Sequence, residues 1–245
     1  MRLKITGTED RKGGLQIQPI CDILSERGHE TAKDGMEGDL CIHFTRADEK
    51  GYSIAKAGRD VYISWHTLTE AFRALGKALE HAGKEKWREE SKGTQGNTGL
   101  MFDCSRNGVL KVEAVKEMIR QAALMGLNWL LLYTEDTYEV EGYPCFGALR
   151  GRYTKEEIRE CDAYAVQFGI EMIPCIQTLA HLRTALRWPA MEKYRDDADI
   201  LLAEEERTYR LIDAMLASVK DMYRSKRVHL GMDEAFYLGY GNYRR

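Results

Sequence analysis

The 245-residue sequence lacks the features typical of exported, membrane-bound or nucleic-acid-binding proteins. Residues 1–6 contain no apolar signal region. The longest strongly apolar run, residues 129–133, is far too short to span a bilayer. The net charge is −3, and lysines and arginines are scattered among acidic residues, so no basic patch favours nucleic acid. We therefore expect a cytoplasmic protein that binds neither membranes nor nucleic acid.

Cysteine and glycine motifs are missing as well. The six cysteines form no Cys-x-x-Cys pair, which favours free thiols in a reducing compartment over a disulfide framework. They also show no metal-ligand spacing. No Gly-x-Gly-x-x-Gly follows any predicted strand, so a dinucleotide-binding fold has little support. We expect no cofactor and no metal.

Residues 1–92 predict a small mixed α/β domain. Period-two alternation and short apolar runs predict its strands at residues 2–6, 39–44, 52–55 and 61–65. Helical spacing of apolar residues predicts its helices at residues 15–26 and 67–82. The polar segment 83–98 combines charge, glycine and serine, which is typical of a linker or exposed connection. Nothing in this domain resembles a catalytic constellation.

Residues 93–245 predict a regular alternation of strands and helices. Apolar runs predict four strands, at residues 99–103, 128–133, 170–176 and 227–231. Amphipathic helices are predicted between them, at residues 112–125, 154–168 and 202–223. The middle helix opens with a capping box, Thr154 and Glu157. Apolar strands separated by helices imply a parallel sheet covered by helices, in a barrel or in a doubly wound open sheet.

Polar side chains follow the end of each predicted strand of this region. In chain order they include Asp103 and Arg106, Glu135 and Asp136, Gln177 and His181, and Asp233 and Glu234. Carboxylates at neighbouring strand ends push their pKa values apart, which lets one stay charged while another holds a proton. Glycosidic cleavage needs that division of roles. By itself, however, an Asp-Glu pair is more typical of a solvated surface.

Together the strand ends resemble glycoside hydrolase family 20, the β-N-acetylhexosaminidases. Residues 229–235 (HLGMDEA) are similar to the family signature His-x-Gly-Gly-Asp-Glu, with Met232 in place of the second glycine. Three further segments of the chain resemble the first three barrel strands of the family: residues 99–106 (GLMFDCSR), 131–136 (LLYTED) and 174–181 (PCIQTLAH). The segments 135–138 and 176–182 most resemble the bacterial intracellular branch, which trims terminal N-acetylglucosamine.

The resemblance implies an α/β fold in which a small domain (1–92, with its linker) precedes the first half of a (β/α)8 TIM barrel (93–245). It implies hydrolysis of terminal β-linked N-acetylhexosamine, GlcNAc or GalNAc, from oligosaccharides or glycoconjugates. In such substrate-assisted retention the substrate's 2-acetamido oxygen attacks the anomeric carbon. Asp233 would orient that group, and Glu234 would act as acid and then as base. The implied substrate-binding residues are His181, Asp136, Arg106 and Gln177.

The sequence also departs from the family pattern. Thr98 precedes Gly99 where the family has a sugar-binding arginine, so that contact would come from Arg106 or elsewhere. A full barrel takes ~250 residues, and residues 93–245 provide only four βα units. We therefore expect a fragment with little activity alone, which self-associates or pairs through the open half barrel.

Three other functions stay open at this point. One is a non-catalytic remnant that binds amino sugars, and another is a purely structural or interaction module. The third is a metal-dependent barrel hydrolase, for which the conceivable ligands are His181, His229, Asp136 and Asp233.

Overall fold

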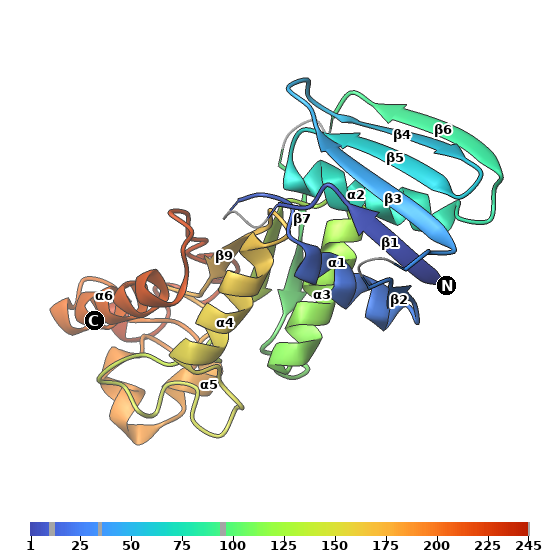
Figure 1. The fold of residues 1–245 in the computed structure, drawn as a ribbon. Coiled ribbons are helices and arrows are strands. Elements are labelled where there is room, and N and C mark those ends of the chain that lie inside the picture. Colours follow the sequence, from blue (N-terminus) through green and yellow to red (C-terminus); the bar gives the residue numbers. More distant parts are fainter. Residues whose placement is uncertain (10–12, 34–35, 94–96, 245) are drawn as a thin grey trace. The chain divides into compact units, whose positions relative to one another are not determined.

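The computed structural model describes residues 1–9, 13–33, 36–93 and 97–244 (Figure 1). The chain divides into two compact units. The N-terminal unit comprises Met1–Gly99, Lys116–Trp129 and Tyr164–Ile170, and the C-terminal unit comprises Leu100–Val115, Leu130–Ala163 and Glu171–Arg245. A domain boundary after residue 92 stays a prediction.

The N-terminal unit is built on a six-stranded sheet in the order β2-β1-β3-β5-β4-β6. Its strands are β1 (Arg2–Thr6), β2 (Glu30–Thr31), β3 (Leu40–Arg46), β4 (Tyr52–Ala57), β5 (Asp60–Trp65) and β6 (Lys86–Ser91). Strand β3 is parallel to β1 and β5, whereas β4 is antiparallel to β5 and β6. Leu40, Ile42 and Phe44 of β3 are buried, and the strand predicted at residues 39–44 is confirmed.

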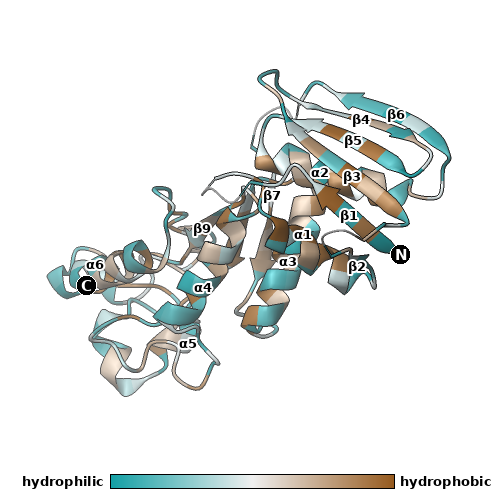
Figure 2. Ribbon diagram, viewed as in Figure 1, coloured by the Kyte–Doolittle hydropathy of each residue, from teal (hydrophilic) through white to brown (hydrophobic). Residues whose placement is uncertain are grey.

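Helices α1 (Ile17–Glu26) and α2 (Leu68–Glu80) confirm the two predicted helices of this unit, with slightly shorter bounds. Helix α2 begins with a complete capping box formed by Thr67 and Glu70, and it packs on β4 and β5. Its Phe72 ring contacts Phe168 at a centroid distance of 4.9 Å. An apolar layer between helices and sheet therefore forms the core (Figure 2).

The predicted linker 83–98 needs a correction, because it contains strand β6. This strand pairs along its whole length with β4. Its residues alternate between half-buried and exposed, a period-two pattern hidden by its charged composition. Charged side chains suit an edge strand because they discourage pairing with another chain. Residues 94–96 of the predicted linker lie outside the described residues.

A three-stranded sheet, in the order β7-β8-β9, starts the second part of the chain. Its strands are β7 (Gly99–Asp103), β8 (Trp129–Tyr133) and β9 (Glu171–Cys175). The intervening and following helices are α3 (Val112–Met125), α4 (Lys155–Val166), the short α5 (Arg183–Leu186) and α6 (Glu206–Met222), with 3-10 turns η1 (Pro189–Tyr194) and η2 (Asn242–Arg244). The predicted strand–helix alternation, and thus the α/β class, is confirmed. So is the capping box of Thr154 and Glu157.

The fourth predicted strand, residues 227–231, is not formed as a regular strand. The structure has a single parallel bridge there, between Cys175 and His229. The His229 amide donates to the Pro174 carbonyl at 2.9 Å, and the His229 carbonyl accepts from Ile176 at 3.0 Å. Val228 and Leu230 are 39% and 41% exposed. In the part of the chain that the structure describes, this segment meets the end of β9 through isolated hydrogen bonds rather than a ladder.

No helix among the described residues is both long enough and apolar enough to cross a membrane.

Candidate active site

His181 and the acid pair lie together where β9 and the 227–231 segment end. The Nε2 atom of His181 is 3.4 Å from Asp233 Oδ2 and 3.3 Å from Glu234 Oε2. Neither contact has hydrogen-bond geometry, so Nε2 has no hydrogen-bond partner among the described residues. The imidazole is mostly buried, whereas the carboxylates are 53% and 59% exposed. The two carboxylates of the cluster are therefore open to solvent, and the histidine beside them is mostly buried.

Two of these residues have a backbone conformation that is costly for a side chain with a Cβ atom. His181 has a φ of 57° and Glu234 a φ of 54°. Each such residue costs about 1–3 kcal/mol and persists only where its surroundings hold it. Backbone strain of this kind clusters at functional sites, and here two instances fall on the acid pair and its histidine.

Gly231 holds the turn into the acid pair. Its φ is 59°, and a Cβ at this position would lie 2.2 Å from the Ile176 carbonyl oxygen and 2.5 Å from Gln177 Oε1. Only glycine fits a position so close to another backbone segment. This close approach accounts for the glycine two residues before Asp233.

Asp233 is held in its charged form. Burial alone would raise its pKa, but four influences outweigh burial: the Asp233 backbone amide, a hydrogen bond from Gln177, and the charges of His181 and His229. The pKa of Asp233 therefore lies below its usual value. The Gln177 bond runs from Nε2 to Asp233 Oδ1 over 3.3 Å.

Gln177 and Arg106 meet at Tyr133, which the sequence did not single out as a site residue. Gln177 is fully buried, and its Nε2 also donates to the Tyr133 hydroxyl at 3.0 Å. Arg106 donates to the same hydroxyl at 2.9 Å, and its guanidinium carbon lies 4.9 Å from the ring centroid. The only hint in the sequence is a polar-tipped aromatic residue at the last position of an apolar strand.

Glu135 belongs to this network, although the sequence favoured its neighbour. Its Oε1 accepts from Arg106 Nε at 3.4 Å, and its Oε2 lies 3.8 Å from Arg150. Burial raises the pKa of Glu135, and Arg106, His181 and Arg150 oppose that rise. Glu135 therefore lies within electrostatic reach of the His181 cluster.

Asp136 is not brought into the cluster. It is fully buried, and its Oδ1 lies 3.3 Å from Arg150 Nε without hydrogen-bond geometry. Burial raises the pKa of Asp136, with Arg150 as the main opposing charge. No contact joins it to His181 or the acid pair among the described residues. Its predicted role in substrate binding stays a prediction.

A metal-dependent reading of the cluster has limited support. The nearest ligand atoms of His181, Asp233 and Glu234 lie within 4.8 Å of one another. Two of these groups are exposed carboxylates, which often lie close together without an ion. The expectation of no metal stays a prediction.

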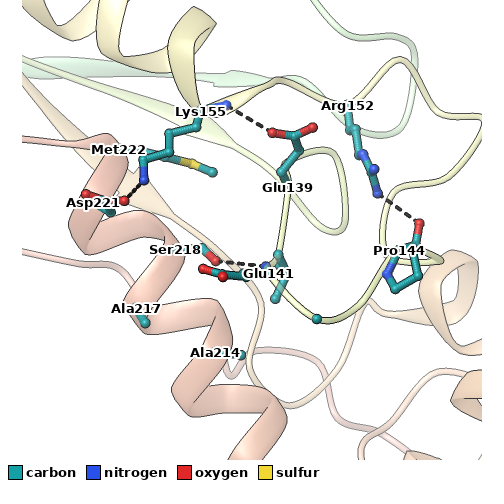
Figure 3. A pocket seen from close by; sticks show the side chains of 12 residues that line it. Glu139, Glu141, Pro144, Arg152, Lys155, Ala214, Ala217, Ser218, Asp221 and Met222 are labelled. Carbon is teal, nitrogen blue, oxygen red and sulfur yellow. Dashed lines mark hydrogen bonds and ion pairs between the residues drawn. The ribbon is translucent and has the colours of Figure 1, made fainter.

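A separate pocket of about 780 Å³ lies in the C-terminal unit, between the segment 139–155 and α6 (Figure 3). Asp221 forms an ion pair with Lys155, whose backbone amide donates to Glu139 at 3.2 Å. The Arg152 guanidinium donates to the Pro144 carbonyl at 3.1 Å. The pocket contains none of the predicted site residues.

Comparison with known proteins identifies the family of the chain. A model described as "Glycosyl hydrolase family 20, catalytic domain" matches residues 98–243, more than half of the sequence. The chain therefore belongs to glycosyl hydrolase family 20.

Curated relatives share part of their sequence with the chain. Hexosaminidase D of Bos taurus is 30% identical over 135 residues, covering 54% of this chain and 39% of that protein. A β-hexosaminidase of Vibrio furnissii is 30% identical over 175 residues, covering 56% and 28%. The chain thus spans well under half the length of these two relatives.

Solved structures show the same fold at lower identity. A β-N-acetylhexosaminidase from Bacteroides fragilis superposes with a TM-score of 0.73 at 23% identity, covering 96% of this chain and 53% of that one. An exo-β-N-acetylglucosaminidase from Vibrio harveyi, solved with N-acetylglucosamine, gives 0.73 at 20% identity, covering 95% and 43%.

Proposed function

We propose that this chain carries the acid–base centre of a cytoplasmic β-N-acetylhexosaminidase, a retaining glycosidase of the substrate-assisted kind. Its substrates would be oligosaccharides or glycoconjugates that end in β-linked N-acetylglucosamine or N-acetylgalactosamine. The observation that carries the proposal is the cluster in which His181 Nε2 lies 3.3–3.4 Å from both acids of the pair. The Vibrio harveyi structure, solved with N-acetylglucosamine, supports the substrate class.

The proposed chemistry assigns different roles to the two acids. Asp233 is charged because its pKa is lowered, so it would accept the substrate's acetamido N–H and stabilise positive charge there as the acetamido oxygen attacks the anomeric carbon. Glu234 is exposed, so it would reach the leaving oxygen, protonate it, and then take a proton from water. His181 would position both carboxylates.

The remaining predicted residues would bind the sugar or support the groups that do. Arg106 is 51% exposed and fixed by Tyr133 and Glu135, so it would donate to a substrate hydroxyl in place of the arginine missing at position 98. Gln177 would orient Asp233, and the buried Asp136 would hold Arg150 in place. Segments 135–138 and 176–182 support assignment to the bacterial intracellular branch.

Hydrolysis of a chromogenic aryl N-acetyl-β-glucosaminide tests this proposal. We expect Glu234→Gln to lower the rate by about 10²–10⁴-fold, as for loss of a general acid–base group. Glu204→Gln is the matched control, because Glu204 is an exposed glutamate with a similar φ of 60°. Full activity of Glu234→Gln would refute the assignment, and loss of activity with a chelator would favour a metal-dependent hydrolase. Binding of N-acetylglucosamine without any hydrolysis would favour the non-catalytic remnant.

We also propose that residues 93–245 form the first half of a (β/α)8 barrel and associate through its open side, with a second copy or with the rest of the domain. Support comes from the single bridge formed by residues 227–231 and from the exposed Leu230 and Met232 beside it. Sedimentation should show association that Leu230→Lys weakens at least about tenfold, as expected for a charge placed on an edge. Tyr62→Lys, on an exposed face of the six-stranded sheet, should leave association unchanged.

A further inference from the structure

Tyr133 joins the Arg106 side and the Asp233 side of the site through its hydroxyl group. It is the last residue of β8 and is 7% exposed. Its hydroxyl lies 2.9 Å from Arg106 and 3.0 Å from Gln177 Nε2. It also lies 3.5 Å from Glu135 Oε1.

The donor and acceptor capacities of these groups, together with the carboxylates of Glu135 and Asp233, which only accept, favour one arrangement. A guanidinium only donates, and a phenol has one proton to give. The Tyr133 oxygen therefore accepts from Arg106, and its own proton is directed at Glu135. The amide of Gln177 must then present its NH2 group, rather than its oxygen, to Tyr133. Burial raises the pKa of Tyr133 to about 12, so the phenol keeps this proton at neutral pH.

The same NH2 group faces Asp233. Once one proton of Gln177 Nε2 points at Tyr133, the other is available to Asp233 Oδ1 at 3.3 Å. A flipped amide would instead turn Gln177 Oε1 towards the carboxylate and repel its charge. The orientation of this amide thus decides whether Asp233 receives a donor or an acceptor.

We propose that Tyr133 is a positioning residue: its hydroxyl fixes the Gln177 amide in the orientation that donates to Asp233. The proposal deepens the proposed function, on which it rests for the catalytic meaning of Asp233. The hydrogen-bonding claim itself concerns only the chain's own groups. Tyr133 touches neither acid of the pair, so it acts through Gln177.

Other groups also face Asp233 and set the background for any change. From the β9 side these are Cys175 and His181, and from its own segment they are His229 and Glu234. Glu135, at the end of β8, lies near His181. None of them changes identity in the substitutions used below, so a change in Asp233 titration reports the amide.

Carboxyl NMR titration of Asp233 in the full chain tests the proposal. We expect Tyr133→Phe to raise the titration midpoint of Asp233 by about one pH unit, because a hydrogen bond to the charged form is lost. Tyr164→Phe is the matched control, since Tyr164 likewise bridges an arginine, Arg120, and an acid, Asp22. The control should leave the Asp233 midpoint where it is in the unmodified chain.

A double-mutant cycle tests the route through Gln177. Gln177→Leu alone should raise the Asp233 midpoint by a similar amount, and adding Tyr133→Phe to it should produce no further rise. The proposal is overturned if Tyr133→Phe shifts Asp233 no more than Tyr164→Phe does, or if its shift persists undiminished beside Gln177→Leu. Should Tyr133→Phe not fold, an unchanged midpoint in Gln177→Leu alone would also overturn it.

Activity gives a second reading that separates this proposal from the proposed function. If the chain hydrolyses the aryl glycoside, the acid limb of the kcat/KM profile should move to higher pH in Tyr133→Phe by the same amount as the NMR midpoint. If Glu234→Gln proves as active as the unmodified chain, the proposed function fails. The Asp233 titration would still decide whether Tyr133 orients Gln177.

Discussion

The two sheets of this protein differ in how they end. The six-stranded sheet ends at β2, which is only two residues long, and at β6, whose outward residues are charged. Short or charged edges protect a sheet from further pairing. The three-stranded sheet instead continues into residues 227–231, which pair by one bridge and expose Val228 and Leu230.

The difference between the two sheets shows that an apolar sequence alone does not form a strand, because a strand also needs a partner with which to pair. Residues 227–231 have a strand-like composition, yet they meet the end of β9 through a single bridge and form no ladder. The highly charged β6 forms a full ladder because β4 offers it six consecutive partners. The acid pair therefore lies at the less supported of the two sheet ends.

The largest effects should come from the cores. We expect Ile63→Ala in β5 and Leu132→Ala in β8 each to lower the free energy of unfolding by about 2–5 kcal/mol, since both side chains are fully buried. Leu132→Ala should fall nearer the lower end, because a sheet with an open side can collapse into the cavity. Denaturant unfolding followed by hydrogen exchange of each strand would measure both. A larger loss of unfolding free energy for Leu132→Ala than for Ile63→Ala would contradict the expected difference between the two sheets.

Two glycines with the same φ angle allow the cost of the close backbone contact near Asp233 and Glu234 to be measured separately. Gly231 and Gly58 both have a φ of 59°, but a Cβ on Gly231 meets backbone at 2.2 Å and one on Gly58 meets nothing within 4 Å. Gly231→Ala should cost about 2–4 kcal/mol, and Gly58→Ala about 1 kcal/mol. Chemical denaturation of both variants checks this. Equal costs would mean that the contact with Ile176 relaxes freely.

Two capping boxes provide a comparison in which the two parts should agree. Thr67 caps α2, and Thr154 caps α4, each with a reciprocal glutamate three residues later. Thr67→Ala and Thr154→Ala should each cost about 1 kcal/mol. Similar losses in thermal unfolding would show that local structure is equally well formed in both parts. A much smaller loss of stability for Thr154→Ala would indicate that α4, like the sheet beside it, is less firmly held than its counterpart α2.

The smallest effect expected is a change in the pH dependence caused by Asp136. Burial raises its folded pKa above the unfolded value near 3.8, so the unfolded chain releases this proton first as pH rises. The Asp136 contribution therefore lowers the free energy of unfolding as pH climbs from about 3.8 through the folded pKa. Asp136→Asn should remove that decline, as seen in unfolding at pH 4 to 7. If the slope of the unfolding free energy against pH is the same in Asp136→Asn, the charge of Arg150 fully offsets the effect of burial on the Asp136 pKa.

The sequence predicted the regular elements well where local pattern decides them. The helix that follows Thr154 was predicted from its capping box, and β1 from its alternation. It missed β6, whose pairing with β4 depends on a partner about 30 residues earlier in the chain. It also assigned residues 227–231 as a strand, although they form a single bridge, because an apolar pattern carries no information about the partner with which a strand pairs.

The family follows from the sequence, since the order of strand-end motifs is a property of the chain, and the same motifs predict the acid pair. Tertiary structure alone decided which polar groups meet. It placed His181 between Asp233 and Glu234, drew Glu135 rather than Asp136 towards them, and made Tyr133 the link to Gln177. Contacts of 3–4 Å between side chains from different strand ends depend on register and on backbone turns such as Gly231. Neither can be derived from the spacing of residues along one strand.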